Sequence, residues 1–208
     1  MPVGNDVVDL RDPANLSVAI HGRFDSRVFA DHERRVLAVA VTDEERHRLR
    51  WTLWAAKESA LKCLRQVDPD LPFHPPEFLV TIESASRAAV VHRGVELDLV
   101  LDVTDARVHV VAVGPGGSDP AAVYRAARVE PGTAVSAPEM SRRVRKLAAR
   151  EIGHLLGQPA GSIEVGNGTR LAPPSARRNG RTLPVELSLS HDGSWIGCAI
   201  RPLLHSTD

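Results

Sequence analysis

The chain has 208 residues, of which 43% are hydrophobic, enough for one large core or two small ones that share an interface. Basic and acidic residues number 26 each, so no overall charge favours nucleic acid or an anionic membrane. No segment reads as a membrane span or a signal peptide, and Cys63 and Cys198 match no metal-binding spacing. We therefore expect a soluble cytoplasmic protein with reduced thiols.

The segment from Pro2 to Leu10 is rich in valine and is predicted to be a buried strand. Alternation places Asp6 on one face with Gly4 and Val8, and Asp9 on the other. A buried carboxylate is costly unless it is paired or bound to a metal. We expect Asp6 to face a site, because Gly4 beside it leaves room for a ligand, and Asp9 to cap the strand end.

Two helices are predicted to follow a loop over residues 11–22. The first covers Phe24 to Ala40. The second opens at Thr42, because Thr42-x-x-Glu45 has the form of a capping box, and it continues to about Gln66. Four prolines in residues 67–76 end it.

Within the second helix, the stretch WTLWAAKESALK carries an apolar stripe on one side. The opposite side holds Trp51, Trp54, Glu58, Lys62 and Arg65. Two tryptophans beside a carboxylate and an ammonium predict that this side is covered. Glu58 and Lys62 are then a candidate site for an anionic, metal-bound ligand. The simpler alternative for this stretch taken alone is an ordinary Glu/Lys pair that stabilises a helix.

Residues 77–114 change to a β pattern, in which FLVTIES, AAVVHRG, ELDLVLDV and RVHVVAVG are predicted strands of an antiparallel meander. Residues 121–129 are predicted to add one more strand. The segment PGTAVSAP has the composition of a linker. We therefore predict two domains, residues 1–130 and 138–208, joined by residues 131–137.

The second domain is predicted to begin with a basic amphipathic helix from Met140 to Leu156. Loop-rich sequence follows, with one short strand at SIEV and a basic segment, ARRNGR, that either wraps a phosphate or is a solvated loop. The segment VELSLSHDGSWIGCAI is predicted to be a hairpin with a tight Asp-Gly turn, with Ser190 and His191 near its tip.

A weak internal repeat relates the two domains, because Ala-Ala-Arg-Glu at 148–151 resembles Ala-Ala-Lys-Glu at 55–58 and a sheet follows both. The predicted fold class is therefore α+β, a pseudo-dimer of two similar halves that each pack a long helix on a small antiparallel sheet. Lys62 has no counterpart in the second half, where Leu155 stands.

Three segments, GNDVVDL, WAAKESALK and LSLSHDGSWIGCAI, together resemble the 4'-phosphopantetheinyl transferases. The first two match that superfamily's G-x-D strand and W/F-x-x-K-E-x-x-x-K helix, and the third looks like its S-H motif. The small members have this motif order at half this length, and the larger pseudo-dimeric members place S-H first. The chain thus resembles a pseudo-dimer with its halves in permuted order, and is expected to be a monomer.

The resemblance implies transfer of the 4'-phosphopantetheine arm of coenzyme A to a serine of an acyl or peptidyl carrier protein of polyketide, peptide or fatty acid synthesis, with release of 3',5'-ADP. By motif position, Asp6 and Glu58 would hold Mg²⁺, and Lys62 would neutralise phosphate charge. The base for the carrier serine remains open between Glu58 and a metal-bound water. Neither nucleic acid nor membrane is expected as a partner.

The resemblance also assigns coenzyme A contacts, with His191 and Ser190 at a phosphate and Lys57 screening charge at the rim. The chain departs from the family's G-K-P segment. Its nearest candidate, residues 168–171, contains Arg170, and Arg177 or Arg178 are the alternatives.

Two other departures lie near the strand and the hairpin. Val8 stands where larger members often have a second acid, and Asp192 follows the S-H pair. Carrier docking is expected on apolar and basic residues after the first strand, namely Leu10, Arg11, Arg23 and Phe29. The alternative functions are a non-catalytic relative that binds coenzyme A or a carrier, and a Mg²⁺-dependent phosphohydrolase.

Overall fold

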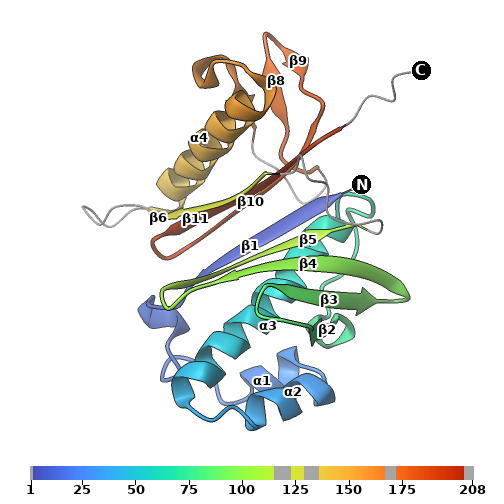
Figure 1. Ribbon diagram of the computed structural model, residues 1–208, viewed down its shortest axis with the longest axis vertical. Coiled ribbons are helices and arrows are strands. Elements are labelled where there is room, and N and C mark those ends of the chain that lie inside the picture. The colour runs from blue at the N-terminus through green and yellow to red at the C-terminus, as the bar shows by residue number, and fades with distance from the viewer. Residues whose placement is uncertain (1, 115–122, 129–135, 167–171, 204–208) are drawn as a thin grey trace.

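The structure, a computed structural model, describes residues 2–114, 123–128, 136–166 and 172–203. In these ranges the strands form three antiparallel sheets, with orders β1-β5-β4-β3-β2, β10-β11-β6 and β7-β8-β9. The first two sheets lie between the long helices α3 and α4, and β1 runs alongside β10 and β11 (Figure 1). The fold is thus mixed α and β, with β1 next to the second sheet.

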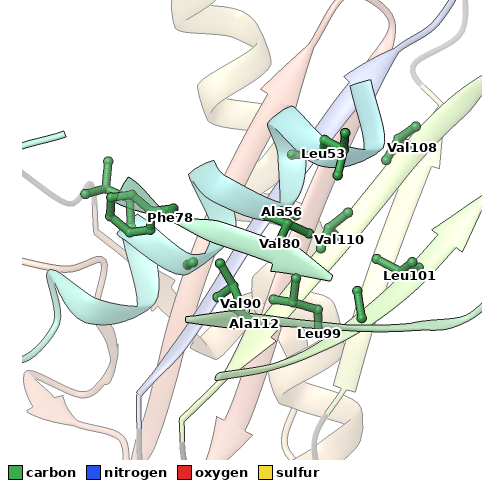
Figure 2. Close-up of a cluster of buried hydrophobic side chains, with 14 of the residues drawn as sticks. Leu53, Ala56, Phe78, Val80, Val90, Leu99, Leu101, Val108, Val110 and Ala112 are labelled. Atoms are coloured by element: carbon green, nitrogen blue, oxygen red, sulfur yellow. The ribbon is translucent and has the colours of Figure 1, made fainter. Parts of the chain in front are cut away.

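The first sheet is the predicted strand and meander. Its strands are β1 (Val3–Asp9), β2 (Leu79–Ile82), β3 (Arg87–His92), β4 (Val95–Val103) and β5 (Arg107–Val113). Helix α3 (Asp43–Leu64) covers one face, where small and branched side chains of the strands meet Leu53 and Ala56 (Figure 2). Burial of this cluster fixes which face of β1 looks toward α3.

The start of α3 confirms Thr42 as its cap, but Glu45 reaches the amide of Val41, one residue before the cap, and not that of Thr42 as in the predicted capping box. The Thr42 hydroxyl accepts a hydrogen bond from the Glu45 amide at 3.0 Å, and the Glu45 carboxylate accepts one from the Val41 amide at 2.8 Å. These bonds satisfy amides that have no partner within the helix. The helix continues to Leu64, close to the predicted end.

The helix predicted from Phe24 to Ala40 is in fact two, α1 (Phe24–Val28) and α2 (Asp31–Ala38). Phe29 between them is extended and fully buried against the α3 cluster. Glu33 accepts a hydrogen bond from the Ala30 amide at 2.8 Å and so begins α2. The break follows from burial of the Phe29 ring, which a continuous amphipathic pattern does not reveal. Short 3₁₀ turns, η1 (Pro13–Asn15) and η2 (Pro75–Glu77), flank the segment.

Helix α4 (Ala137–Leu156) packs on the second sheet, which contains β6 (Val123–Arg128), β10 (Val185–Asp192) and β11 (Trp195–Pro202). The turn between β10 and β11 consists of Gly193 and Ser194, not of the expected Asp-Gly, because Asp192 still pairs with Trp195. Gly193 has φ +50, which suits glycine.

The basic segment predicted to be a loop is instead a small hairpin. It contains β8 (Ala176–Arg178) and β9 (Arg181–Thr182), with β7 (Glu164–Val165) alongside and the 3₁₀ turn η3 (Ala160–Ser162) before it. Asn179 and Gly180 both have positive φ, +49 and +74. Asn-Gly is the strongest short hairpin signal, and the sequence interpretation overlooked it.

Both cysteines are buried and free, and burial raises the pKa of each thiol to about 12. No helix in the described ranges is long and apolar enough to cross a membrane. Most of the predicted linker, residues 131–135, lies outside the described residues, so the division into two domains stays a prediction.

Candidate functional site

One pocket, where β1, α3 and β10 meet, collects three of the seven predicted site residues. Its lining comprises Asp6, Val7, Val8, Asn15, Trp51, Trp54, Glu58, His191 and Asp192. The tryptophan-bearing side of α3 is covered, as expected: the Phe24 ring of α1 lies 5.8 Å from the Trp51 ring and 5.7 Å from the Trp54 ring. Three segments far apart in the chain therefore bring Asp6, Glu58 and His191 to one place.

Lys62 lies beside these acidic groups. Its ammonium is 2.6 Å from Asp6 Oδ1 and donates to the Asn5 carbonyl at 3.1 Å. Burial raises the pKa of Asp6, and the Lys62 charge opposes that shift. Burial also raises the pKa of Glu58, with Lys62 opposing and Asp6 adding to the increase. The pocket therefore holds two desolvated carboxylates close enough to interact, where added positive charge is favourable.

The expected metal can be tested against this donor set. In the described residues no group of three or more His, Cys, Asp or Glu side chains forms a metal cluster. Mg²⁺ is usually held by only one or two carboxylates, with water and substrate phosphates completing its shell. Asp6 and Glu58 line the same pocket and supply hard oxygen donors. These two residues fit Mg²⁺ shared with a phosphate ligand.

His191 and Ser190 point to opposite faces of β10, because side chains alternate along a strand. His191 is in the pocket lining, and partial burial together with nearby Lys62 lowers its pKa. Ser190 is buried, and its hydroxyl donates to Asn5 Oδ1 at 2.7 Å. The structure therefore brings His191 into the pocket but turns the Ser190 hydroxyl toward the interior between the sheets.

Lys57 does not lie at the rim of the site, contrary to the expectation. Its side chain is fully buried and 2.7 Å from Glu33 Oε2, and it also donates to the carbonyls of Pro75 and Phe78 at 3.0 and 2.6 Å. Glu33 is equally buried and also accepts from the Val80 amide. Desolvation lowers the pKa of Lys57, and Glu33 opposes that shift. Lys57 therefore joins α3 to α2 and β2 on the side away from Asp6.

Replacing Lys57 with methionine should destabilise the protein by about 3 kcal/mol, because it leaves the Glu33 carboxylate buried without its cation. The loss is measured as the change in free energy of unfolding by urea. Lys146→Met, an exposed lysine on α4, is the matched control and should change stability by less than about 0.5 kcal/mol. Equal small changes in both variants would contradict the structural assignment of Lys57.

Asp192 also lines this pocket, and its carboxylate fixes the hairpin. Its Oδ2 accepts hydrogen bonds from the Asp9 amide at 2.8 Å and from Asn15 Nδ2 at 2.6 Å. Asp9 in turn accepts from the Arg11 and Ser194 amides, at 3.0 and 2.8 Å. Asp9 is thus a capping residue, as expected, and Asp192 ties the hairpin tip to the end of β1.

A second pocket lies along α3 beyond Lys62. Its lining is Lys62, Arg65, Gln66, Pro173, Pro174, Leu187, Ser188 and Leu189. Lys62 lines this second pocket, and its ammonium lies 2.6 Å from Asp6, which lines the first, so Lys62 stands where the two pockets adjoin. Arg170, the expected adenine or 3'-phosphate contact, lies outside the described residues, as does the rest of the G-K-P candidate at 168–171.

Of the four residues expected to dock the carrier, two are buried and two are exposed. Leu10 and Phe29 are buried, at 6% and 0% exposure, so the expectation that they form a docking surface is wrong. Both belong to the core around α3. Arg11 and Arg23 are exposed on the segment that follows β1.

Sequence reasoning missed two asparagines at the site. Asn5 is fully buried and bonded to Ser188 and Ser190, and Asn15 is bonded to Asp192 and to the Asp9 carbonyl. A signal did exist for Asn5. An amide in a strand of valines needs hydrogen-bond partners once buried, and those partners had to come from elsewhere in the chain.

Comparison with known proteins gives two findings. A family model described as the 4'-phosphopantetheinyl transferase superfamily matches residues 2–112. Among solved structures, one titled as apo-ACPS from Chronobacterium ammoiniagenes is 22% identical, covers 53% of this chain and 92% of that chain, and has a TM-score of 0.44. No curated protein matches the chain.

Proposed function

This chain belongs to the 4'-phosphopantetheinyl transferase superfamily, and we propose that it moves the phosphopantetheine arm of coenzyme A onto a serine of an acyl or peptidyl carrier protein. One observation carries the proposal. Asp6 and Glu58 line one pocket with His191, and the Lys62 ammonium lies 2.6 Å from Asp6. Carboxylates for a metal and cations for phosphate are the groups that transfer from a pyrophosphate needs.

Each residue has a defined task in this proposal. Asp6 and Glu58 would hold Mg²⁺, which would neutralise charge on the pyrophosphate. Lys62 exchanges its bond to Asp6 for one to a phosphate oxygen and stabilises the charge that develops on 3',5'-ADP as it leaves. His191 donates to a phosphate from the opposite wall. The serine oxygen of the carrier then bonds to phosphorus as the bond from phosphorus to 3',5'-ADP breaks, and the serine proton passes to Glu58 or to a water, the two candidate bases.

The second half, in this proposal, is a copy of the first without its own site. Each half packs a long helix on an antiparallel sheet, and Glu151 of α4 corresponds to Glu58 in the internal repeat. The Glu151 carboxylate is paired with Arg125 at 3.4 Å and with Arg150 at 2.9 Å. These arginines compensate the charge of Glu151, which supports the proposal of one site per chain. The chain in this proposal is a monomeric pseudo-dimer with its halves in permuted order.

The carrier is proposed to dock on the exposed arginines after β1. Arg11→Glu or Arg23→Glu should raise KM for an acidic carrier about fivefold, because a like charge then meets the acidic surface around the carrier serine. Steady-state kinetics with varied carrier concentration measure the change. Arg87→Glu, exposed on β3, is the control and should leave KM unchanged. An unchanged KM in the Arg11 and Arg23 variants would remove this docking surface.

Release of 3',5'-ADP tests the proposed reaction against its alternatives. The protein is incubated with coenzyme A and Mg²⁺, with and without an apo carrier, and the nucleotide is followed by chromatography. A transferase releases 3',5'-ADP only when the carrier is present. Release without a carrier would indicate a phosphohydrolase, and binding of coenzyme A without release would indicate a non-catalytic relative.

A further inference from the structure

The strand that carries His191 is held on both sides of that residue by asparagines from the start of the chain. On one side, Asn5 of β1 accepts a hydrogen bond from the Ser190 hydroxyl at 2.7 Å. On the other side, Asn15 of η1 donates to Asp192 Oδ2 at 2.6 Å. The two residues that flank His191 are therefore both anchored to the segment that contains Asp6.

These side-chain bonds are needed because β1 and β10 belong to different sheets. No ladder of backbone hydrogen bonds sets the position of one strand along the other, as it does within a sheet. Instead, the backbone amide of Asn5 donates to the Ser188 hydroxyl at 2.9 Å, and the backbone amide of Asp9 donates to the Asp192 carboxylate at 2.8 Å. The alignment of β10 on β1 thus depends on a few side chains.

The Asn5 side chain is closely confined. It is fully buried, and its Oδ1 is 3.2 Å from His109 Nε2, in a ring that is neutral because burial lowers its pKa to about 4. A Cβ added at Gly197 would lie 3.0 Å from both Asn5 Oδ1 and Ser190 Oγ. The absence of a side chain at Gly197 lets β11 pass over this bond, so the amide is closely surrounded by its neighbours.

Asn15 is also fixed by its surroundings. Its amide nitrogen donates to the Asp9 carbonyl at 2.9 Å as well as to Asp192, and its own carbonyl accepts from Trp51 Nε1 at 3.0 Å. Through Trp51 it is attached to α3, the helix that carries Glu58. The tip of the β10–β11 hairpin is therefore bonded, through Asn15, to the end of β1, which carries Asp6, and to α3, which carries Glu58.

We propose that Asn5 and Asn15 are positioning residues that hold the imidazole of His191 in register with Asp6 and Glu58, an inference that rests on the proposed function. The Asn5 side chain binds the neighbour of His191 and acts through it. A small displacement of His191 would weaken its contact with a phosphate whose Mg²⁺ would be held by Asp6 and Glu58, because transfer depends on closely set distances.

A double-mutant cycle on kcat tests this role. Asn5→Ala should lower kcat about tenfold at saturating coenzyme A, carrier and Mg²⁺. In a His191→Gln background, which retains a hydrogen-bond donor and is expected to keep measurable turnover, the same substitution should cost less than about twofold in kcat. Ser190→Ala removes the same hydrogen bond and should behave like Asn5→Ala. The same cycle on the Kd for coenzyme A gives a reading that does not depend on turnover.

A control separates positioning from loss of stability. Val144→Ala removes buried volume in the α4 core, away from the pocket, and should lower Tm by about 5 °C without changing kcat well below Tm. The positioning role would be overturned, with the proposed function left standing, by either of two results. One is a double variant whose loss of kcat is the product of the two single losses, and the other is a Val144→Ala variant that loses as much kcat as Asn5→Ala. A wild-type protein that modifies no carrier would overturn the proposed function and the role of both asparagines with it.

Discussion

Glu58→Gln is expected to lower the rate of carrier modification by about a hundredfold or more, because the substitution removes one of the two carboxylate charges proposed to hold Mg²⁺. Glutamine has nearly the shape of glutamate, and the Glu58 side chain is only partly buried, so the fold should remain intact. Initial rates of transfer at saturating coenzyme A measure the effect. Raising the Mg²⁺ concentration should recover part of the lost rate, because the weakened site can still be filled by mass action.

The matched control for this substitution is Glu44→Gln. Glu44 lies on the same helix, exposed in its first turn and remote from the pocket lining. It should keep the wild-type rate. Comparable losses in both variants would show that helix charge, and not a metal carboxylate, accounts for the effect.

Gly4→Ala is expected to prevent stable folding, with a loss of about 5 kcal/mol or more in the free energy of unfolding. A Cβ at this position would lie 2.0 Å from the Ser59 carbonyl oxygen and 2.5 Å from the Cys63 amide nitrogen. Both atoms belong to the backbone of α3 and cannot move without separating the helix from β1. The space beside Gly4 is therefore filled by α3, which corrects the expectation that a ligand approaches there.

Circular dichroism and urea unfolding of the soluble fraction measure this loss. Gly22→Ala is the control, because an added Cβ there would have no heavy atom within 4 Å. It should leave stability within about 0.5 kcal/mol of wild type. A stable, fully folded Gly4→Ala protein would mean that β1 and α3 are not packed as described.

Periodicity predicted the elements of this fold better than it predicted their contacts. The helix cap at Thr42, the meander and the final hairpin follow local patterns, and the structure contains all of them. The break at Phe29 and the small hairpin at Asn179-Gly180 were missed. The first depends on tertiary burial of a ring, and the second was a local signal that the basic composition of the segment obscured.

The site shows the same limit at the level of single residues. Asp6, Glu58, Lys62 and His191 were predicted from their motifs and do lie together. Lys57 lies on the far side of α3, where its ammonium pairs with Glu33 of α2. The sequence of α3 alone cannot reveal that partner, because it comes from another helix. Strand alternation, by contrast, does imply that Ser190 and His191 face opposite ways.

The most direct test of the central claim is intact-mass analysis of apo carrier proteins incubated with this protein, coenzyme A and Mg²⁺. Carriers of fatty acid, polyketide and peptide synthesis are assayed side by side. We expect at least one to gain the mass of a single phosphopantetheine arm, and to lose that gain when its acceptor serine is replaced by alanine. Unchanged masses for every carrier, from a folded protein that binds coenzyme A, would contradict the account.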